Sequence, residues 1–265
     1  MITRHSIAAE WLRSPASGDC LRKERVYMIR HVLFDLDGTL LPMCQQEFLG
    51  YYLSLLSRRF EKYGIHQEVF LKSVYEGIGV MINNDGSRTN EQAFWDCFES
   101  SAGVDRREME EDILEFYENE FNEAIASTRP TPVSGQIVRL LKEKGVKVYL
   151  ATNPVFPRCA TWNRIRWAGL QAEDFEWITT YETSRYCKPN VKYYEEILER
   201  FQLDPAECLM AGNDVRDDLP ARKLGIRTYL VTDCLENAGD LPAKADETGT
   251  LEELLESVKM WRAER

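Results

Sequence analysis

The segment HVLFDLDGTL, residues 31–40, constrains the fold more than any other part of this 265-residue chain. It begins with a short apolar run typical of a buried strand, and Asp37-Gly38 is a strong turn signal. In an α/β sheet, a turn at the carboxyl end of a strand lies where ligands usually bind. The string Asp-x-Asp-Gly-Thr would arise by chance on the order of once in 10⁵ positions at average residue usage. The carboxylates of Asp35 and Asp37 therefore predict a functional site.

Three further polar segments each adjoin an apolar or amphipathic run. In chain order they are Thr152-Asn153-Pro154, Lys188-Pro189 and Gly212-Asn213-Asp214. The first and the last follow the apolar runs 146–151 and 208–211, and the middle one precedes a helix-like run at residues 193–198. Because the carboxyl ends of parallel strands meet at one edge of a sheet, we expect these segments to gather there.

Glycines and capping residues divide the rest of the core into alternating strands and helices. Helical runs stop at Gly145, Gly169 and Gly225, where glycine supplies a C-terminal cap. Residues 176–180 and 226–231 have strand character, and residues 250–253 form a capping box that opens a last helix. The alternation predicts an α/β fold with a doubly wound parallel sheet, a Rossmann-like core.

Residues 42–128 have helical spacing instead. Apolar side chains recur there at intervals of three and four, and one amphipathic helix is predicted to run from Ile113 to Ile125. We interpret the many aromatic residues of this segment as the core of a small helical bundle.

The ordered motifs resemble those of the haloacid dehalogenase-like superfamily of phosphohydrolases, over about residues 31–232. The first motif is matched by Asp35-Leu36-Asp37-Gly38-Thr39, the second by Thr152, the third by Lys188, and the fourth by Asp214 with Asp217 or Asp218. The fourth motif departs from the common Gly-Asp form, because Asn213 stands where many members carry the first acid. This departure leaves Asp214 as the metal ligand.

The resemblance implies a magnesium-dependent phosphohydrolase that removes phosphate from a small phosphorylated metabolite through an aspartyl-phosphate intermediate. Asp35 would be the nucleophile, and Asp37 would act first as general acid and then as general base. The phosphate would be bound by Thr152, Asn153 and Lys188, of which Thr152 and Lys188 also stabilise the reaction. The Mg²⁺ ion would be held by Asp35, the backbone carbonyl of Asp37 and Asp214, with Asp218 or Asp217 acting indirectly.

The resemblance also implies an α-helical cap domain, residues 45–127, inserted into a catalytic core formed by residues 28–44 and 128–265. Loops of such a cap that face the site would determine specificity. The candidates are Arg88, in the turn-rich stretch 83–88, and Gln45 and Gln46; an ordinary solvated turn is the alternative for Arg88. Residues 1–27 are expected to be a disordered N-terminal extension.

Composition excludes several other classes. A net charge of −11 argues against a nucleic-acid partner, and the chain has no stretch of about 20 apolar residues that would span a membrane. The seven cysteines lack Cys-x-x-Cys spacing, which disfavours a zinc site or a disulfide framework and fits a reducing cytoplasm. Cys187 adjoins Lys188, but we expect an inert thiol there. The three histidines form no nucleophile–base arrangement, so the carboxylates must carry the chemistry.

Two alternatives to a phosphatase stay open. One is a phosphomutase of the same superfamily, and the other is a non-catalytic phosphate-binding or regulatory protein on this fold. Dehalogenation is disfavoured because that reaction has no leaving oxygen for Asp37 to protonate. Neither the substrate nor the oligomeric state can be read from the sequence.

Overall fold

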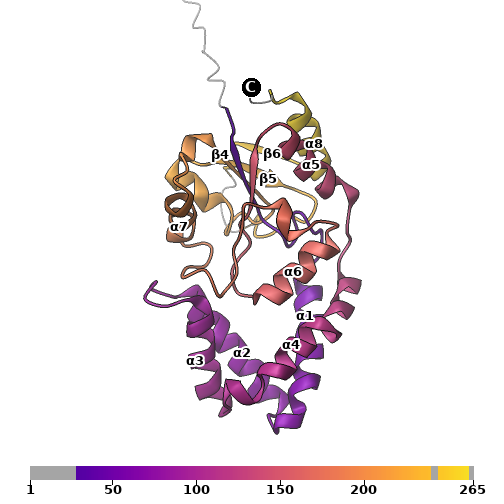
Figure 1. The fold of residues 1–265 in the computed structure, drawn as a ribbon, viewed down its shortest axis with the longest axis vertical. Helices are drawn as coiled ribbons and strands as arrows, with labels where there is room; N and C mark the ends of the chain where they lie inside the picture. Colours follow the sequence, from indigo (N-terminus) through magenta and orange to yellow (C-terminus); the bar gives the residue numbers. More distant parts are fainter. Residues whose placement is uncertain (1–27, 240–243, 263–265) are drawn as a thin grey trace, which may run out of the picture.

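A six-stranded parallel sheet forms the centre of the core (Figure 1). The structure is a computed structural model that describes residues 28–239 and 244–262, so the extension expected at residues 1–27 lies outside the described residues. The strands are β1 (His31–Phe34), β2 (Lys147–Leu150), β3 (Trp177–Ile178), β4 (Cys208–Gly212), β5 (Arg227–Val231) and β6 (Glu247–Gly249). Their order is β3-β2-β1-β4-β5-β6. The chain therefore builds outward in both directions from β1 and β4, and the crevice at the carboxyl ends of these two strands is the usual ligand site of such sheets.

Both faces of the sheet are covered, which explains why its strands are nearly continuous apolar runs. Val32 and Phe34 belong to one hydrophobic cluster with α5 and α8, whereas Leu33 points to the opposite cluster with α7. The helices of the core are α5 (Pro132–Glu143), α6 (Arg158–Trp167), α7 (Val191–Phe201) and α8 (Leu251–Met260). The predicted doubly wound α/β fold is confirmed, and the capping box of Thr250 and Glu253 is formed.

The segment between β1 and α5 is helical. Its elements are α1 (Gln45–Phe60), α2 (Gln67–Ile82), α3 (Asn90–Ala102), α4 (Glu110–Glu118) and three short 3₁₀ helices at Glu61–Tyr63, Arg106–Glu108 and Glu120–Ser127. Figure 1 shows them beyond the end of the sheet at which β1 leads toward α1. The chain leaves and returns at one point, because Met43 forms an antiparallel bridge with Thr128.

The helical segment shares its hydrophobic core with the sheet. Residues of α1 and α4 belong to the same cluster as Val32 and Phe34 of β1. The ring of Phe121 stacks on that of Trp167 in α6, with centroids 5.0 Å apart. The helices are therefore anchored on the core by aromatic packing.

Three elements differ from the sequence-based expectations. The helix predicted from Ile113 to Ile125 is interrupted: α4 ends at Glu118, Asn119 leaves the helical region, and a 3₁₀ helix follows. The side chain of Asn119 donates to the carbonyl of Glu115, the local competition that makes asparagine a poor interior helix residue. The run before Gly225 is a 3₁₀ helix, Leu219–Leu224. Strand β6 was not predicted because it contains no apolar run.

The helices in the described part of the chain include none that is long and apolar enough to cross a membrane.

Candidate active site

The turn after β1 places the first two carboxylates. The backbone amide of Asp35 donates to the carbonyl of Ala211 at 2.9 Å, which continues the pairing of β1 with β4 up to the turn. Gly38 follows with φ +84°, and a Cβ atom at this position would collide with the side chain of Asn213. Glycine is therefore required at Gly38 both for the left-handed conformation and for the close approach of the β4 turn.

Lys188 is the electrostatic centre of the site. Its Nζ donates to Oδ1 of Asp35 at 2.8 Å and to Oδ1 of Asp218 at 2.7 Å, and its side chain is only 1% exposed. Burial lowers the pKa of Lys188, but the two carboxylates outweigh burial and raise the pKa well above its usual value. Lys188 is therefore charged at neutral pH. Of the two acids left open by the sequence, Asp218 is the one that contacts Lys188.

Asn213 has a structural position beside the first motif. Its Oδ1 accepts a hydrogen bond from the Thr39 hydroxyl at 2.9 Å, and its Nδ2 donates to the carbonyl of Cys234 at 2.6 Å. The amide thus joins the turns that follow β1 and β4 to a third segment. A neutral side chain with one donor and one acceptor suits this position better than a carboxylate, which offers acceptors only.

Asp214 and Asp218 order the loop after β4. The backbone amide of Asp214 donates to Oδ2 of Asp218 at 2.9 Å, and its own carboxylate accepts from the amides of Arg216 and Asp217. Gly212 permits this arrangement, because a Cβ atom there would collide with the carboxylate of Asp218. Asp218 therefore supports both the proposed metal ligand and Lys188.

The end of β2 supplies Thr152 and Asn153. Thr152 is buried, and its carbonyl accepts hydrogen bonds from the hydroxyls of Thr179 and Tyr193 at 2.7 and 2.9 Å. Oδ1 of Asn153 accepts from the backbone amide of Lys188 at 3.2 Å, and its Nδ2 donates to Asp217 at 3.0 Å. Burial raises the pKa of Asp217 to about 6, and the charge of Asp214 adds to this shift.

Asp37 forms a buried ion pair with Arg164 of α6. One carboxylate oxygen of Asp37 accepts from the Arg164 guanidinium, and the other oxygen has no hydrogen-bond partner in the described part of the chain. Arg164 is fully buried, and its guanidinium lies 4.1 Å from the centre of the Phe156 ring. Burial raises the pKa of Asp37, while Arg164 opposes that shift. The unpaired oxygen of Asp37 is the atom that could carry a proton.

Arg164 was missed by the sequence-based reasoning. The signal was weak but present: it lies four residues after Ala160 and three before Trp167, both of which are buried. An arginine on the buried face of a helix needs an anionic partner, and Asp37 is the partner found.

A cavity of about 70 Å³ joins these side chains. It is lined by Asp35, Asp37, Gln45, Thr152, Asn153, Val155, Phe156, Asn213, Asp214, Asp217 and Asp218. Gln45, predicted as a specificity candidate, therefore lies at the cavity, whereas Gln46 does not line it. Arg88 does not line it either, and its guanidinium pairs with exposed Asp96 at 2.5 Å, as expected of the solvated turn that was the alternative for Arg88. Both side chains of this pair are exposed.

Cys187 lies beside Lys188 but is an unreactive thiol by its environment. It is 1% exposed, and burial raises the pKa of its thiol, with a further contribution from the charge of Asp217. The neighbouring lysine does not reverse this, because the charge of Lys188 is directed at Asp35 and Asp218.

The donor set fits a magnesium ion. Asp35 and Asp214 line the same cavity. Within the described part of the chain, Oδ2 of Asp35 receives only a long hydrogen bond of 3.4 Å from Thr39, whereas both carboxylate oxygens of Asp214 accept hydrogen bonds, Oδ2 from Asn237 at 2.8 Å. No group of three or more His, Cys, Asp or Glu side chains within residues 28–239 and 244–262 is arranged to hold a metal. Mg²⁺ commonly binds through one or two carboxylates and completes its shell with water and substrate phosphate. Two carboxylates at one cavity, those of Asp35 and Asp214, are within the number of protein ligands that Mg²⁺ commonly uses.

The fold is that of an α/β enzyme, and its candidate site gathers aspartates that follow β1 and β4 with a lysine from the loop before α7. The family model for haloacid dehalogenase-like hydrolases matches residues 29–225, and the chain belongs to this family. It is 24% identical over 204 residues to the "Putative phosphatase YhcW" of Bacillus subtilis, covering 77% of this chain and 84% of that protein. It is 28% identical over 118 residues to the glyceraldehyde 3-phosphate phosphatase of Methanothermobacter thermautotrophicus, covering 44% and 51%.

Among solved structures, the fold is similar to that of a phosphatase of the same family from Thermococcus onnurineus. The TM-score is 0.57 at 20% identity, and the match covers 89% of this chain and all of that chain. These relatives are named phosphatases, which agrees with hydrolysis of phosphoric monoesters.

Proposed function

We propose that this protein is a magnesium-dependent phosphatase that forms an aspartyl-phosphate on Asp35. The observation that carries the proposal is the buried ammonium of Lys188, held between Asp35 and Asp218 at 2.8 and 2.7 Å. A permanent positive charge beside the nucleophile is what an anionic carboxylate needs in order to approach an anionic phosphate. The phosphatase names of its relatives support the same reaction class.

In the first step a carboxylate oxygen of Asp35 attacks phosphorus, and the bond from phosphorus to the ester oxygen breaks. Asp37 gives its proton to the departing alkoxide, so the alcohol leaves neutral. In the second step Asp37 removes a proton from water as the water oxygen attacks phosphorus. Inorganic phosphate leaves, and the carboxylate of Asp35 and the protonated Asp37 are restored.

Other residues of the site would bind the phosphoryl group. The Thr152 hydroxyl and the Asn153 backbone follow β2, and we assign them with Lys188 to the phosphoryl oxygens. Arg164 would position Asp37 by holding one of its two oxygens, which leaves the other for proton transfer.

Asp35, Asp214 and the backbone carbonyl of Asp37 would hold Mg²⁺, with Asp218 supporting the Asp214 loop. When bound, the ion would neutralise the repulsion between the Asp35 carboxylate and the phosphate. We also assign residues 45–127 as a cap domain over a core of residues 28–44 and 128–265. The net charge of −11 favours a small phosphorylated substrate over a nucleic acid, and the free cysteines suit the cytoplasm.

The decisive experiment measures hydrolysis of an aryl phosphate by the parent protein and by Asp35→Asn, with Mg²⁺ and with excess chelator. The amide cannot form the phosphoenzyme, so the variant should be inactive, and the chelator should abolish turnover by the parent. Acid-quenched parent protein should carry a covalent phosphate that the variant lacks. Asp96→Asn, at an exposed position on α3, is the matched control and should keep full activity. Activity in Asp35→Asn, or turnover that survives the chelator, contradicts the proposal.

A further inference from the structure

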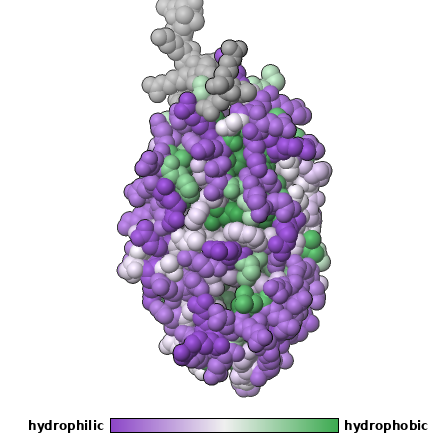
Figure 2. Space-filling view, in the orientation of Figure 1, coloured by the Kyte–Doolittle hydropathy of each residue, from purple (hydrophilic) through white to green (hydrophobic). Residues whose placement is uncertain are grey.

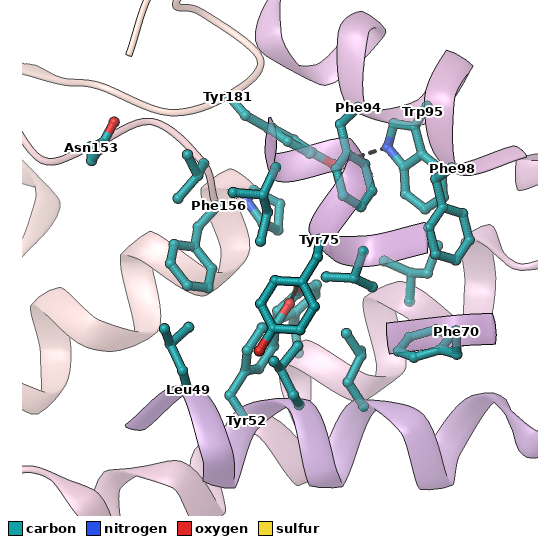
Figure 3. A pocket seen from close by; sticks show the side chains of 18 of the residues that line it. Leu49, Tyr52, Phe70, Tyr75, Phe94, Trp95, Phe98, Asn153, Phe156 and Tyr181 are labelled. Carbon is teal, nitrogen blue, oxygen red and sulfur yellow. Dashed lines mark hydrogen bonds between the residues drawn. The ribbon is translucent and has the colours of Figure 1, made fainter. Parts of the chain in front are cut away.

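A second and larger cavity lies next to the catalytic one. Its volume is about 310 Å³, and its walls come from α1 to α4, the loop after β2 and Tyr181. Figure 3 shows Leu49 and Tyr52 on one side, Phe94, Trp95 and Phe98 on the opposite side, and Phe156 between them and Asn153. Figure 2 shows a hollow in the helical half with hydrophobic residues at its opening.

The two cavities are adjacent and share part of their lining. Gln45, Asn153, Val155, Phe156 and Asp217 line both of them. We infer that a group esterified to a phosphate in the catalytic cavity extends past Phe156 into the larger one, because Phe156 and Asn153 face both cavities. The larger cavity is thus placed to accept the leaving group of the reaction.

The polar atoms in the walls are largely paired with one another. The hydroxyls of Tyr52 and Tyr117 are hydrogen-bonded at 2.8 Å, and the indole N–H of Trp95 donates to the hydroxyl of Tyr181 at 3.3 Å. The described residues that line this cavity include no lysine, arginine or histidine. A sugar would have to bury hydroxyls without partners, each weakening binding roughly ten- to a hundredfold. A second anionic group would find no cation.

We propose that the substrate is the phosphate monoester of a predominantly apolar alcohol, whose hydrocarbon or aromatic part occupies this cavity. The inference rests on the phosphatase function proposed above and names its substrate class. Benzene fills an apolar cavity of roughly 150 Å³. By that scale, a cavity of about 310 Å³ accommodates on the order of ten to twelve carbon atoms.

The test is the rate of phosphate release from n-alkyl monophosphates of increasing length, with glycerol 3-phosphate and glucose 6-phosphate as polar comparators. Every alkyl ester has the same primary leaving group, so chain length changes burial alone. We expect kcat/KM to rise about fourfold per methylene, until roughly ten carbons fill the cavity. A flat series, or a preference for the polyol phosphates, overturns the inference. Absence of turnover on every ester, aryl phosphate included, overturns the phosphatase function instead.

The affinities of the same alkyl phosphates, measured by calorimetry, test the substrate class independently of turnover. Decyl phosphate should bind far more tightly than ethyl phosphate. Equal affinities would overturn the inference even if both esters were hydrolysed.

Two pairs of variants test whether the dependence of kcat/KM on chain length arises in this cavity. Val74 lines the cavity and Val69, on the same helix, does not. Val74→Phe should lower the ratio of kcat/KM for decyl over ethyl phosphate at least tenfold, and Val69→Phe should leave it unchanged. Ile82 also lines the cavity and is 41% exposed. The Ile82→Glu protein should therefore fold even if the bulkier side chain prevents Val74→Phe from folding. Its control is Leu114→Glu, 53% exposed and outside the cavity. Identical ratios within both pairs would overturn the inference.

Discussion

Replacing Arg164 with methionine tests the ion pair that holds Asp37. The guanidinium is fully buried and the Asp37 side chain is 16% exposed, so the substitution leaves a mostly buried carboxylate without a cation. Breaking a buried pair by removing one partner costs about 3–5 kcal/mol. Because Asp37 keeps some exposure to solvent, we expect the loss in free energy of unfolding to lie near the lower end of this range. Methionine also fills much of the space that the Arg164 side chain occupies beside Phe156. We therefore expect the free energy of unfolding to fall by about 3 kcal/mol.

Urea unfolding of the parent, Arg164→Met, Asp37→Asn and the double variant measures this loss. The double variant contains no unpaired carboxylate, so it should be about 1–3 kcal/mol more stable than the sum of the single losses predicts. Arg166→Met is the control on the same helix, because Arg166 is exposed, and it should change stability by about 0.5 kcal/mol or less.

The loss should depend on pH in a defined direction. Burial raises the pKa of Asp37 and Arg164 opposes the shift, so removing Arg164 raises the folded-state pKa further above the unfolded value. An acid with a raised folded-state pKa stabilises the protein below its unfolded pKa, and this contribution disappears as the pH rises through the folded-state value. The deficit of Arg164→Met should therefore be small near about pH 4 and complete above the folded-state pKa. A deficit that does not change with pH, or a double variant no better than the summed singles, would refute the ion-pair reasoning.

Two further outcomes follow from close packing and burial. Gly212→Ala should displace the Asp218 carboxylate from Lys188 and lower phosphatase activity at least tenfold, whereas Gly50→Ala, where nothing lies within 4 Å, should keep full activity. Phosphate release and thermal unfolding of both variants check this, and a fully active Gly212→Ala contradicts it. In thiol labelling at pH 8, exposed Cys44 should react first among the cysteines of residues 28–239 and 244–262. Cys208 should stay protected, because burial raises its pKa to about 12 and leaves a thiolate fraction on the order of 10⁻⁴. Rapid labelling of Cys208 in the native protein would show that its burial is wrong.

The cluster of proposed catalytic residues was predictable because most of its members follow strands of a parallel sheet. Asp35, Thr152 and Asp214 each come after an apolar run, and such runs end at one edge of the sheet. Lys188 has no strand of its own before it, and only its place in the series of motifs marked it. Which of Asp217 and Asp218 contacts Lys188 could not be predicted, since neighbouring residues of an irregular turn point in directions that the sequence does not encode.

Arg164 and Asn213 show a second limit of prediction from sequence, which concerns contacts between distant parts of the chain. The partner of Arg164 lies 127 positions away along the chain and that of Asn213 lies 174 positions away. A sequence pattern reports spacing within one element, so it identifies an inward-facing arginine but not the carboxylate that neutralises it. Such pairs depend on how α6 and the β4 turn are placed against the first motif.

The apolar cavity could not be predicted from the sequence, although it matters most for the proposed substrate class. Helical periodicity identified most of the inward-facing residues of α1, α2 and α3, although Tyr51 and Val69, which it also placed inward, are exposed. The aromatic residues of these helices were interpreted as a bundle core. Periodicity states which side chains point inward, but not whether two inward faces meet. Here Phe94 and Phe98 of α3 stack on each other, yet the space between them and Tyr52 of α1 stays open beside the catalytic cavity. Aromatic stripes that face an acidic strand edge can therefore line a substrate site as readily as a core.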